Sequence, residues 1–337
     1  MIRLKLRRNR AQSSEFDGTT GELFAEIQRL TELNRETRDA ATEREVLRLR
    51  HLAGIRLLEA APADPEFARP ATEALPAADG LPAIAAAELD PRLLRAGILR
   101  DGCLLVRGLV SRDAALTFAE HIERAFEERD RDGDAEPGWY EEFDPHPRYG
   151  AIDNRAWIKE GGGVLAIDSP LLSFEMLELF ELAGIPELVA GYLGEPPLIS
   201  IEKTTLRKAE PTVGGAWHQD GAFMGKVRSL NLWLALSRCG DVAPGLDIVP
   251  RRLEEFAPTQ TEDAVLSYQV SNQKAQDAAG GVAIVRPVFE PGDALFFDEK
   301  CLHQTASDPS MPNPRFAIEN WFFGGSAFPG EFAPVAV

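Results

Sequence analysis

The first part of the chain carries apolar residues at helical spacing. Residues between Leu23 and Leu30 recur on one face of a segment in which Thr19 and Glu22 have the spacing of a capping box. The polar face is rich in Arg and Glu, as expected of a helix face in contact with water. The pattern therefore predicts a helix from about residue 19 to residue 59.

Two further helices are predicted after a segment rich in alanine and proline. Prolines recur between residues 61 and 92, which prevents a continuous helix there and predicts a linker or a strap lying on the main body. Ser111 has the position of an N-cap ahead of an amphipathic segment that includes Phe118. Ser169 opens another helix, with Pro170 at the favoured first position.

The pattern changes to short apolar stretches from residue 198 onward, after an earlier one at 103–109. Gly, Pro and Asp separate these stretches, as expected of strands joined by turns. The strands predicted in the second half are Leu198–Leu206, Gly214–Gly221, Leu230–Leu236, Leu246–Val249, Val282–Phe289, Ala294–Phe297 and Arg315–Phe323. Helices first and strands second predict a mainly β sandwich or barrel with N-terminal helices packed against it.

The same pattern predicts how the chain is organised. Residues 1–60 form an N-terminal helical extension, and residues 61–92 form the linker or strap. Residues 93–337 form the main domain. The oligomeric state cannot be predicted from this pattern.

Composition narrows the classes of function. Of the 337 residues 44% are apolar, which is enough for a sizeable core. Lys and Arg number 36 against 54 Asp and Glu, for a net charge of −18. A surface this negative repels phosphate backbones and anionic lipids, so we expect neither nucleic acid nor a membrane as a partner. Three scattered cysteines without a CxxC pair, and a basic start without an apolar stretch after it, favour a cytoplasmic protein.

A histidine and a carboxylate two residues apart provide the first candidate chemistry. His218 and Asp220 lie in the predicted strand 214–221, where alternate side chains share one face of the strand. They therefore project together as a pair of metal ligands, while Trp217 and Gln219 project to the other side. Because an acidic chain often contains such a pair by chance, the pair alone is weak evidence for a metal.

His303 and Arg315 strengthen the metal hypothesis. His303 follows the predicted strand at 294–297 after a short loop, and Arg315 begins the last predicted strand. Two histidines and one carboxylate on one face of an octahedron leave open positions, as in non-haem Fe(II) oxygenases. Of the remaining histidines, His51 is predicted to be a solvated surface residue and His121 a packing or surface residue. His146 is predicted to lie in a loop.

Short motifs follow one another between residues 94 and 323. They are Gly97-Ile-Leu-Arg-Asp-Gly-Cys-Leu-Leu-Val-Arg-Gly-Leu, Trp217-His-Gln-Asp-Gly, Asn231-Leu-Trp-Leu-Ala-Leu, Pro244-Gly-Leu-Asp-Ile-Val-Pro, Pro291-Gly-Asp-Ala-Leu-Phe-Phe, His303-Gln-Thr and Arg315. In their order and spacing they resemble the phytanoyl-CoA dioxygenase family of Fe(II)/2-oxoglutarate-dependent oxygenases. The resemblance implies a double-stranded β-helix (jelly-roll) core, Fe(II), 2-oxoglutarate and O2, and oxidation of a small molecule with release of succinate and CO2.

The resemblance also implies roles for individual residues. The iron ligands of the family fall on His218, Asp220 and His303. Arg315 takes the position of the arginine that binds the distal carboxylate of 2-oxoglutarate, for which its planar guanidinium is suited. Thr305 takes the position of a hydroxyl that helps to hold the same carboxylate, and Trp233 that of a pocket-lining tryptophan. Lys203 is a candidate for a contact to the co-substrate or the substrate.

Two features depart from the family pattern. Val249 is followed by Pro-Arg-Arg, where the family commonly has Pro-Gly-Ser-His, so we expect this loop to serve another purpose. The helix before residue 60 has no counterpart in the shortest members. Asp220, by contrast, is intact, whereas relatives that halogenate have a small residue there, so halogenation is disfavoured.

Three functions are compatible with these residues. The first is a 2-oxoglutarate-dependent hydroxylase of a small molecule, the second a cupin-like metal enzyme that does not use 2-oxoglutarate, and the third a non-catalytic binding protein of the same fold. The triad together with Arg315 favours the first. Trp157, Phe223 and Met224, which we expect near the pocket, indicate an apolar or mixed cavity but identify neither the substrate nor the kind of oxidation.

Overall fold

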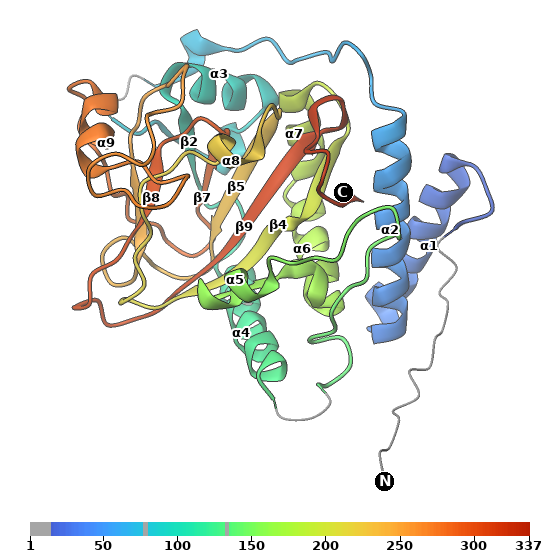
Figure 1. Ribbon diagram of the computed structural model, residues 1–337. Helices are drawn as coiled ribbons and strands as arrows, with labels where there is room; N and C mark the ends of the chain where they lie inside the picture. The colour runs from blue at the N-terminus through green and yellow to red at the C-terminus, as the bar shows by residue number, and fades with distance from the viewer. Residues whose placement is uncertain (1–14, 77–79, 132–134) are drawn as a thin grey trace.

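Two sheets of unequal size form the centre of the protein (Figure 1). The computed structural model describes residues 15–76, 80–131 and 135–337. In the described part, the large sheet has the strand order β1-β2-β7-β5-β9-β4-β10, with β3 paired to β4, and the small sheet pairs β6 with β8. The strands are β1 (Ala83–Ala85), β2 (Cys103–Arg107), β3 (Gly163–Leu165), β4 (Pro197–Ala209), β5 (Ser229–Ala235), β6 (Gly245–Ile248), β7 (Ala294–Phe297), β8 (His303–Ala306), β9 (Arg315–Gly324) and β10 (Pro334–Ala336). The predicted jelly-roll core with flanking helices is confirmed.

Helices cover one face of the large sheet and one of its edges (Figure 1). The α-helices are α1 (Thr20–Thr37), α2 (Ala40–Glu59), α3 (Pro91–Asp101), α4 (Arg112–Arg129), α5 (Arg155–Glu160), α6 (Pro170–Leu182), α7 (Ile185–Leu193), α8 (Gly221–Met224) and α9 (Asn272–Ala279). Short 3-10 turns lie at Thr72–Ala74, Ala86–Glu88, Ala166–Asp168 and Gly325–Ala327. The helix starts predicted at Ser111 and Ser169 are confirmed, since both side chains accept a hydrogen bond from the first turn of α4 and α6.

Alternation along the strands of the large sheet creates two apolar clusters. Leu232 of β5 and Phe322 of β9 belong to the cluster that packs under the helices. Trp233 and Phe323, their neighbours in sequence, belong to the cluster between the two sheets, together with Leu246 of β6. Because successive side chains point to opposite faces, the large sheet is buried on both sides. The face toward the small sheet is the one that carries the polar residues described below.

The helix predicted from residue 19 to residue 59 is two helices. Arg38 has a left-handed backbone with φ of 48°, which ends α1. The Asp39 carboxylate then accepts a hydrogen bond of 2.8 Å from the Thr42 N–H and caps α2. The side chain of Asn34 accepts from the Asp39 N–H at 2.8 Å and fixes the turn between the two helices. The capping box at Thr19 is confirmed.

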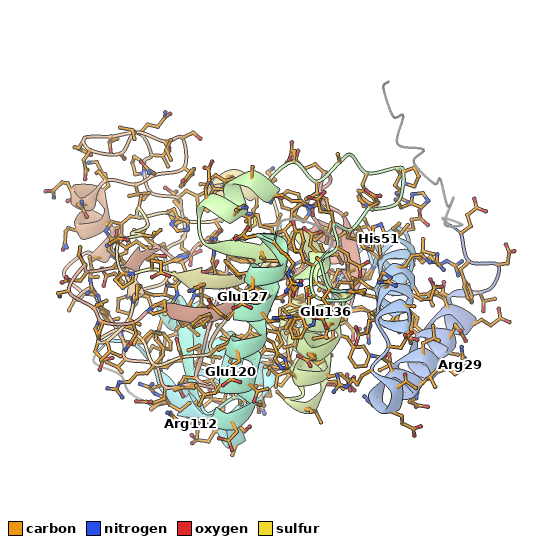
Figure 2. All side chains as sticks on the ribbon, turned by 90° about the horizontal axis from the view of Figure 1, so that it is seen from below. Arg29, His51, Arg112, Glu120, Glu127 and Glu136 are labelled. Carbon is orange, nitrogen blue, oxygen red and sulfur yellow. The ribbon has the colours of Figure 1, made fainter. Side chains whose placement is uncertain are left out.

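His51 is buried, which corrects the prediction of a solvated residue. It lies on the side of α2 that packs against β10, the strand that extends the edge of the large sheet beside β4 (Figure 2). Its Nδ1 donates to the Pro334 carbonyl at 2.6 Å, and its Nε2 accepts from the His146 N–H at 3.0 Å. His51 therefore joins α2 to β10.

The segment rich in proline lies along the main body as a strap. The Glu66 N–H donates to the Gly194 carbonyl and the Ala68 N–H to the Gly191 carbonyl, both at 3.0 Å. Further along, β1 pairs in parallel with β2. This short strand was not predicted, because the prolines around it indicate irregular backbone.

Two predicted strands are not strands. The segment 214–221 forms only isolated bridges at Trp217 and His218 before α8 begins, and the segment 282–289 forms only isolated bridges at Val285 and Phe289. Their partners are loop residues or single strand positions, so no continuous ladder develops, and the first segment turns into α8 at Asp220. The conclusion that His218 and Asp220 share one side of the chain does not depend on such a ladder.

Three remaining expectations concern the chain as a whole. Cys103, Cys239 and Cys301 are buried free thiols, as expected for cysteines without a disulfide framework. Across the described ranges, no helix combines the length and the apolar character needed to cross a membrane. The basic start of the chain, on which the prediction of no signal peptide depends, lies outside the described residues.

Candidate metal centre and cavity

The backbone brings His218 and His303 together. His218 forms an isolated antiparallel bridge with His303, the first residue of β8. The His218 N–H donates to the His303 carbonyl at 2.9 Å, and the His303 N–H donates to the His218 carbonyl at 3.1 Å. The centroids of the two imidazole rings are 4.4 Å apart. Two predicted ligands that are distant in sequence are thus held side by side by main-chain hydrogen bonds.

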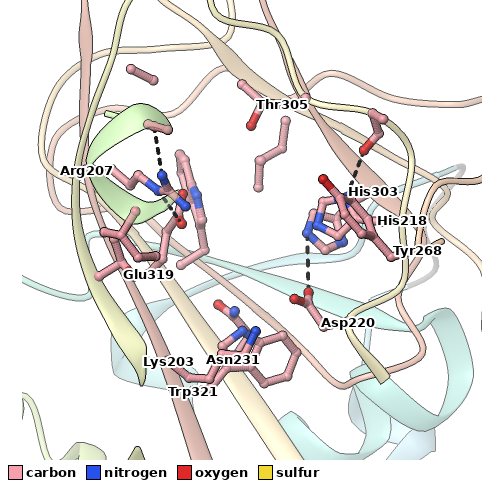
Figure 3. Close-up of a pocket in the computed structure, with 18 of the residues that line it drawn as sticks. Lys203, Arg207, His218, Asp220, Asn231, Tyr268, His303, Thr305, Glu319 and Trp321 are labelled. Atoms are coloured by element: carbon pink, nitrogen blue, oxygen red, sulfur yellow. Dashed lines mark hydrogen bonds and ion pairs between the residues drawn. The ribbon is translucent and has the colours of Figure 1, made fainter. Parts of the chain in front are cut away.

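Asp220 completes the group of three ligands. Its Oδ2 lies 3.7 Å from His303 Nε2, and one ligand atom from each of His218, Asp220 and His303 lies within 4.8 Å of the others (Figure 3). Asp220 stands at the start of α8, and Gly221 follows it because a Cβ there would lie 2.6 Å from the Phe256 ring. The turn into α8 therefore aims the carboxylate at the two imidazoles.

Hydrogen bonds to carbonyls select the ring nitrogens that are free to bind a metal. His218 Nδ1 lies 2.8 Å from the Ala216 carbonyl, and His303 Nδ1 lies 3.1 Å from the Cys301 carbonyl. Since a carbonyl oxygen only accepts, each Nδ1 carries the proton and each Nε2 carries a lone pair. Two neutral imidazole nitrogens and one carboxylate form the donor set of non-haem Fe(II) sites. The residues therefore fit the metal that the sequence analysis predicts.

The triad opens into a cavity of about 520 Å³ between the two sheets (Figure 3). This volume lies in the range of sites that hold a small organic ligand. The predicted residues Trp157 and Phe223 line the cavity, whereas Met224 is buried in the apolar cluster between the sheets and does not line it. The cavity also contains charged residues from β4 and β9.

Arg315 lies in this cavity and is almost completely buried, at 1% exposed. Its Nη1 donates to the Gly245 carbonyl at 3.2 Å, and its Nη2 donates to Glu319 Oε1 at 3.3 Å. Its Nε has no hydrogen-bond partner among the described residues. Burial lowers the pKa of the guanidinium. A buried guanidinium with a free donor is suited to a carboxylate ligand, because an unsatisfied buried donor is costly.

Glu319 and Arg207 also line the cavity, although neither was predicted from the sequence. Arg207 Nε donates to Glu319 Oε2 at 2.8 Å, so Glu319 lies between two guanidinium groups, those of Arg207 and Arg315 (Figure 3). Burial alone would raise the pKa of Glu319, but the two arginines outweigh it and lower the pKa. Alternation from Arg315 along β9 indicates that Glu319 shares its face, but Arg207 on β4 gives no local signal.

The other predicted site residues line the same cavity. Thr305 follows His303 on β8, and its Oγ1 lies close to the backbone of Gly215. The Trp233 ring lies 5.2 Å from the Arg315 guanidinium, and its Nε1 has no hydrogen-bond partner in the described part of the chain. Lys203 Nζ lies 4.2 Å from the centroid of the Phe223 ring. Their roles toward a co-substrate stay predictions.

A second layer of contacts holds the loop that precedes His303. Gln219 Nε2 donates to the Lys300 carbonyl at 2.7 Å, and Gln219 Oε1 accepts from the Ala257 N–H at 2.7 Å. Arg252 forms a largely buried ion pair with Asp298, which lies in the same loop. The Pro-Arg-Arg segment that departs from the family pattern therefore supports the loop that leads to a metal ligand.

The remaining histidines lie outside the cavity. His121 Nδ1 lies 2.7 Å from the Glu175 carboxylate, and this hydrogen bond raises the pKa of His121. His146 is a loop residue as predicted, and its backbone N–H donates to His51 Nε2.

Comparison with known proteins adds a family and a set of similar structures. A family model described as phytanoyl-CoA dioxygenase matches residues 98–311, which include His218, Asp220 and His303. A search of curated proteins found no match.

Several solved structures resemble the chain at low identity. The structure of EctD from S. alaskensis with 2-oxoglutarate and 5-hydroxyectoine has 16% identity, covers 78% of this chain and 84% of its own, and has a TM-score of 0.49. The carbocyclase SnoK from nogalamycin biosynthesis has 16% identity, coverages of 75% and 99%, and a TM-score of 0.49. The epimerase SnoN, in complex with Fe3+, alpha ketoglutarate and nogalamycin RO, has 18% identity, coverages of 69% and 83%, and a TM-score of 0.44.

Proposed function

The chain belongs to the phytanoyl-CoA dioxygenase family, and from that premise we propose that it is an Fe(II)- and 2-oxoglutarate-dependent oxygenase that hydroxylates a small organic molecule. One observation carries the proposal beyond family membership. The buried Arg315 guanidinium, with an unpaired Nε, lines the same cavity as His218, Asp220 and His303. A metal triad and a carboxylate-binding cation in one enclosed space suit a dicarboxylate that chelates the metal at one end.

The triad would hold the iron. His218 and His303 would each bind through Nε2, and Asp220 through a carboxylate oxygen, so that one negative charge offsets part of the charge of Fe(II). Bound iron and 2-oxoglutarate supply the activation of O2, coupled to decarboxylation of 2-oxoglutarate to succinate and CO2. The protein holds the ligands in place and keeps the reacting centre away from bulk water.

Arg315 would bind the distal carboxylate of 2-oxoglutarate, with the Thr305 hydroxyl beside it. The arginine is held by the Gly245 carbonyl and by Glu319, so the fork is already oriented before a ligand arrives. The Trp233 ring lies against the guanidinium and limits the directions in which it can turn. We assign this activity to residues 93–337, with residues 1–60 as a helical extension and residues 61–92 as a strap.

Visible absorption under anaerobic conditions tests the metal and the co-substrate together. Fe(II) is added to the purified protein, followed by 2-oxoglutarate, for the unsubstituted protein, Arg315→Ala and Arg112→Ala. Arg112 is exposed on α4, outside the cavity, and serves as the matched control. We expect a charge-transfer band that requires both additions, is retained in Arg112→Ala and weakens in Arg315→Ala.

Two results would contradict the proposal in different ways. Iron binding without any band would refute 2-oxoglutarate as the co-substrate and favour a cupin-like metal enzyme. Absence of iron binding would refute the assignment of His218, Asp220 and His303 as metal ligands. Once a substrate is found by succinate release, mass spectrometry of the product separates hydroxylation, which adds one oxygen atom, from desaturation, which removes two hydrogens.

A further inference from the structure

Lys203 presents an ammonium group to the cavity without an acidic partner. It lines the cavity from β4, and in the described part of the chain no carboxylate lies within ion-pair distance of its Nζ. Its closest aromatic neighbours are the rings of Phe223 and Phe332, whose centroids lie 4.2 Å and 5.9 Å from Nζ. Burial lowers the pKa of Lys203, and the charge of Asp220 opposes that shift. A cation taken out of water in this way is stabilised by an anion brought to it.

The other charges of the cavity already have partners. Arg207 and Arg315 share Glu319, and Asp220 belongs to the metal triad. The carboxylate of Glu202, which also lines the cavity, accepts hydrogen bonds from the Ser200 hydroxyl and the Ala333 N–H and forms no ion pair with Lys203 among the described residues. Under the proposed function, 2-oxoglutarate has one carboxylate on Arg315 and its keto acid end on the metal, so both of its anionic groups are accounted for. Lys203 then remains as a cation for a second anionic ligand.

Lys203 lies at the other end of the cavity from the arginine. Along the β4–β9 pair, Arg315 is opposite Ala209, whereas Lys203 lies in the irregular stretch between Ile199 and Thr204. Figure 3 shows Lys203, Asn231 and Trp321 gathered on one side of the cavity and Thr305 on the opposite side. The cavity therefore has two separate cationic regions rather than one.

A polar atom beside Lys203 also lacks a partner. Asn231 Oδ1 is buried and makes no hydrogen bond within the described ranges. Since the oxygen and nitrogen of an amide exchange places by rotation, Asn231 can present N–H donors to the same space. A carboxylate accepts hydrogen bonds from both an ammonium and an amide, whereas an ammonium ligand would be repelled by Lys203.

The walls that lead away from Lys203 are aromatic. The Phe223 ring packs against Tyr268 with centroids 5.8 Å apart, and Tyr268 packs against His218 at 6.2 Å. Trp157 and Phe223 are 56% and 40% exposed although both line the cavity, so they lie where it meets solvent. An apolar ligand that covers these rings removes their surface from water and is stabilised by doing so.

We propose that the substrate is an amphipathic carboxylic acid whose carboxylate binds Lys203 and Asn231 and whose apolar part lies against Phe223, Tyr268 and Trp157. This assignment rests on the proposed function, because it takes the arginine end of the cavity as the place of 2-oxoglutarate. It names a class of substrate defined by one anionic group and an apolar body.

Calorimetric titration of the anaerobic protein, loaded with Fe(II) and 2-oxoglutarate, tests this assignment. Octanoate and octanamide serve as probes, because they share the apolar chain and differ in the anionic group. We expect octanoate to bind at least about tenfold more tightly than octanamide, as a hydrogen-bonded ion pair requires. The charge-transfer band, recorded in the same samples, shows whether 2-oxoglutarate stays bound and excludes displacement of the co-substrate.

Two variants locate the effect. In Lys203→Met the preference for octanoate over octanamide should disappear, while the dissociation constant of 2-oxoglutarate stays the same. Lys226→Met, which removes an exposed lysine outside the cavity, should retain the preference. Lys203→Arg should restore part of it, because a cation is present again.

The outcomes that overturn the assignment differ from those that overturn the proposed function. Octanoate that fails to bind, or that binds no more tightly than octanamide, refutes the carboxylate site. A Lys203→Met protein that loses 2-oxoglutarate affinity and octanoate preference together assigns Lys203 to the co-substrate instead. Absence of the band in the unsubstituted protein concerns the proposed function, and the octanoate comparison is then made with Fe(II) alone.

Discussion

His218 and His303 donate their backbone N–H groups to each other's carbonyl oxygens, at 2.9 Å and 3.1 Å. The two residues are therefore fixed by the main chain before any side-chain contact is considered. Their Nδ1 atoms are also held, each by the carbonyl two residues earlier. A site built in this way exists in the folded chain and is absent from the unfolded one, so a bound metal stabilises the fold.

The first prediction concerns this metal linkage. Under anaerobic conditions, Fe(II) at about a hundred times its dissociation constant should stabilise the protein by roughly 3 kcal/mol and raise the Tm by a few degrees. His303→Gln should show no such increase, because it removes one of the three ligands. Thermal unfolding by circular dichroism measures the shift. His121→Gln, which changes a histidine outside the cavity, should keep it, and an unchanged shift in His303→Gln would refute the site.

The second prediction concerns Glu319, whose carboxylate lies 3.3 Å from the Arg315 guanidinium. A distal carboxylate bound to Arg315 would be repelled by this charge. Glu319→Gln keeps the size of the side chain and one of the two oxygen acceptors, and it removes the charge, so 2-oxoglutarate should bind more tightly by roughly threefold to tenfold. Titration of the charge-transfer band measures the affinity.

A matched change of charge separates the local effect from a general one. Glu120→Gln removes an acidic residue from the exposed face of α4 (Figure 2) and should leave the affinity unchanged. Weaker binding in Glu319→Gln would mean that the carboxylate orients Arg315 more than it repels the ligand.

The third prediction concerns the dependence of stability on pH. Burial lowers the pKa of His51 from its ordinary value of 6.5 to about 4. Above pH 6.5 the residue is neutral in both states, whereas between pH 6.5 and pH 4 the unfolded chain binds a proton that the folded chain excludes. As the pH is lowered through this window, the free energy of unfolding should therefore fall by about 1.4 kcal/mol per pH unit on account of His51.

Urea unfolding at a series of pH values measures this slope. His51→Gln removes the titrating group, so its slope between pH 6.5 and pH 4 should be smaller than that of the unsubstituted protein. His121 provides the opposite case, because the hydrogen bond that its ring donates to the Glu175 carboxylate raises its pKa, so its contribution to stability is lost as the pH rises. An unchanged slope in His51→Gln would show that this histidine is protonated in the folded protein.

The fourth prediction concerns the ion pair between Arg252 and Asp298. Arg252→Met leaves a buried carboxylate without its partner, which should lower the free energy of unfolding by about 3 kcal/mol. Because Asp298 lies in the loop that leads to His303, Fe(II) affinity should fall as well. Arg251→Met is the control, since Arg251 is exposed and should cost much less. Equal losses of unfolding free energy in the two variants would show that the ion pair between Arg252 and Asp298 has no special role.

Much of the fold could be predicted because its signals are local. The strand predicted at 294–297 coincides with β7, and the last predicted strand coincides with β9 except for its final residue. Both have apolar residues in short runs bounded by turn residues. The metal ligands could be predicted for a similar reason, since His218 and Asp220 are only two residues apart in the sequence.

The features that could not be predicted depend on distant partners. His51 lies in a charged helix, and only its contact with Pro334 explains why it is buried. Arg207 and Glu319 meet because β4 and β9 pair in one particular register, which the sequence of neither strand indicates. The segment 214–221 has the alternation of a strand, but the residues opposite it form only single bridges. The sequence pattern therefore predicts a strand where no continuous pairing exists.

The contact between α2 and β10 has a consequence for the order of folding. The hydrogen bond from His51 to Pro334 joins residues separated by 283 positions, and β10 also completes the edge of the large sheet. The loss of chain entropy on closing a loop grows with its length, so contacts of this span are unfavourable until the intervening structure has formed. We expect α2 to dock last, on a sheet that is already assembled, and its release to be an early step in unfolding.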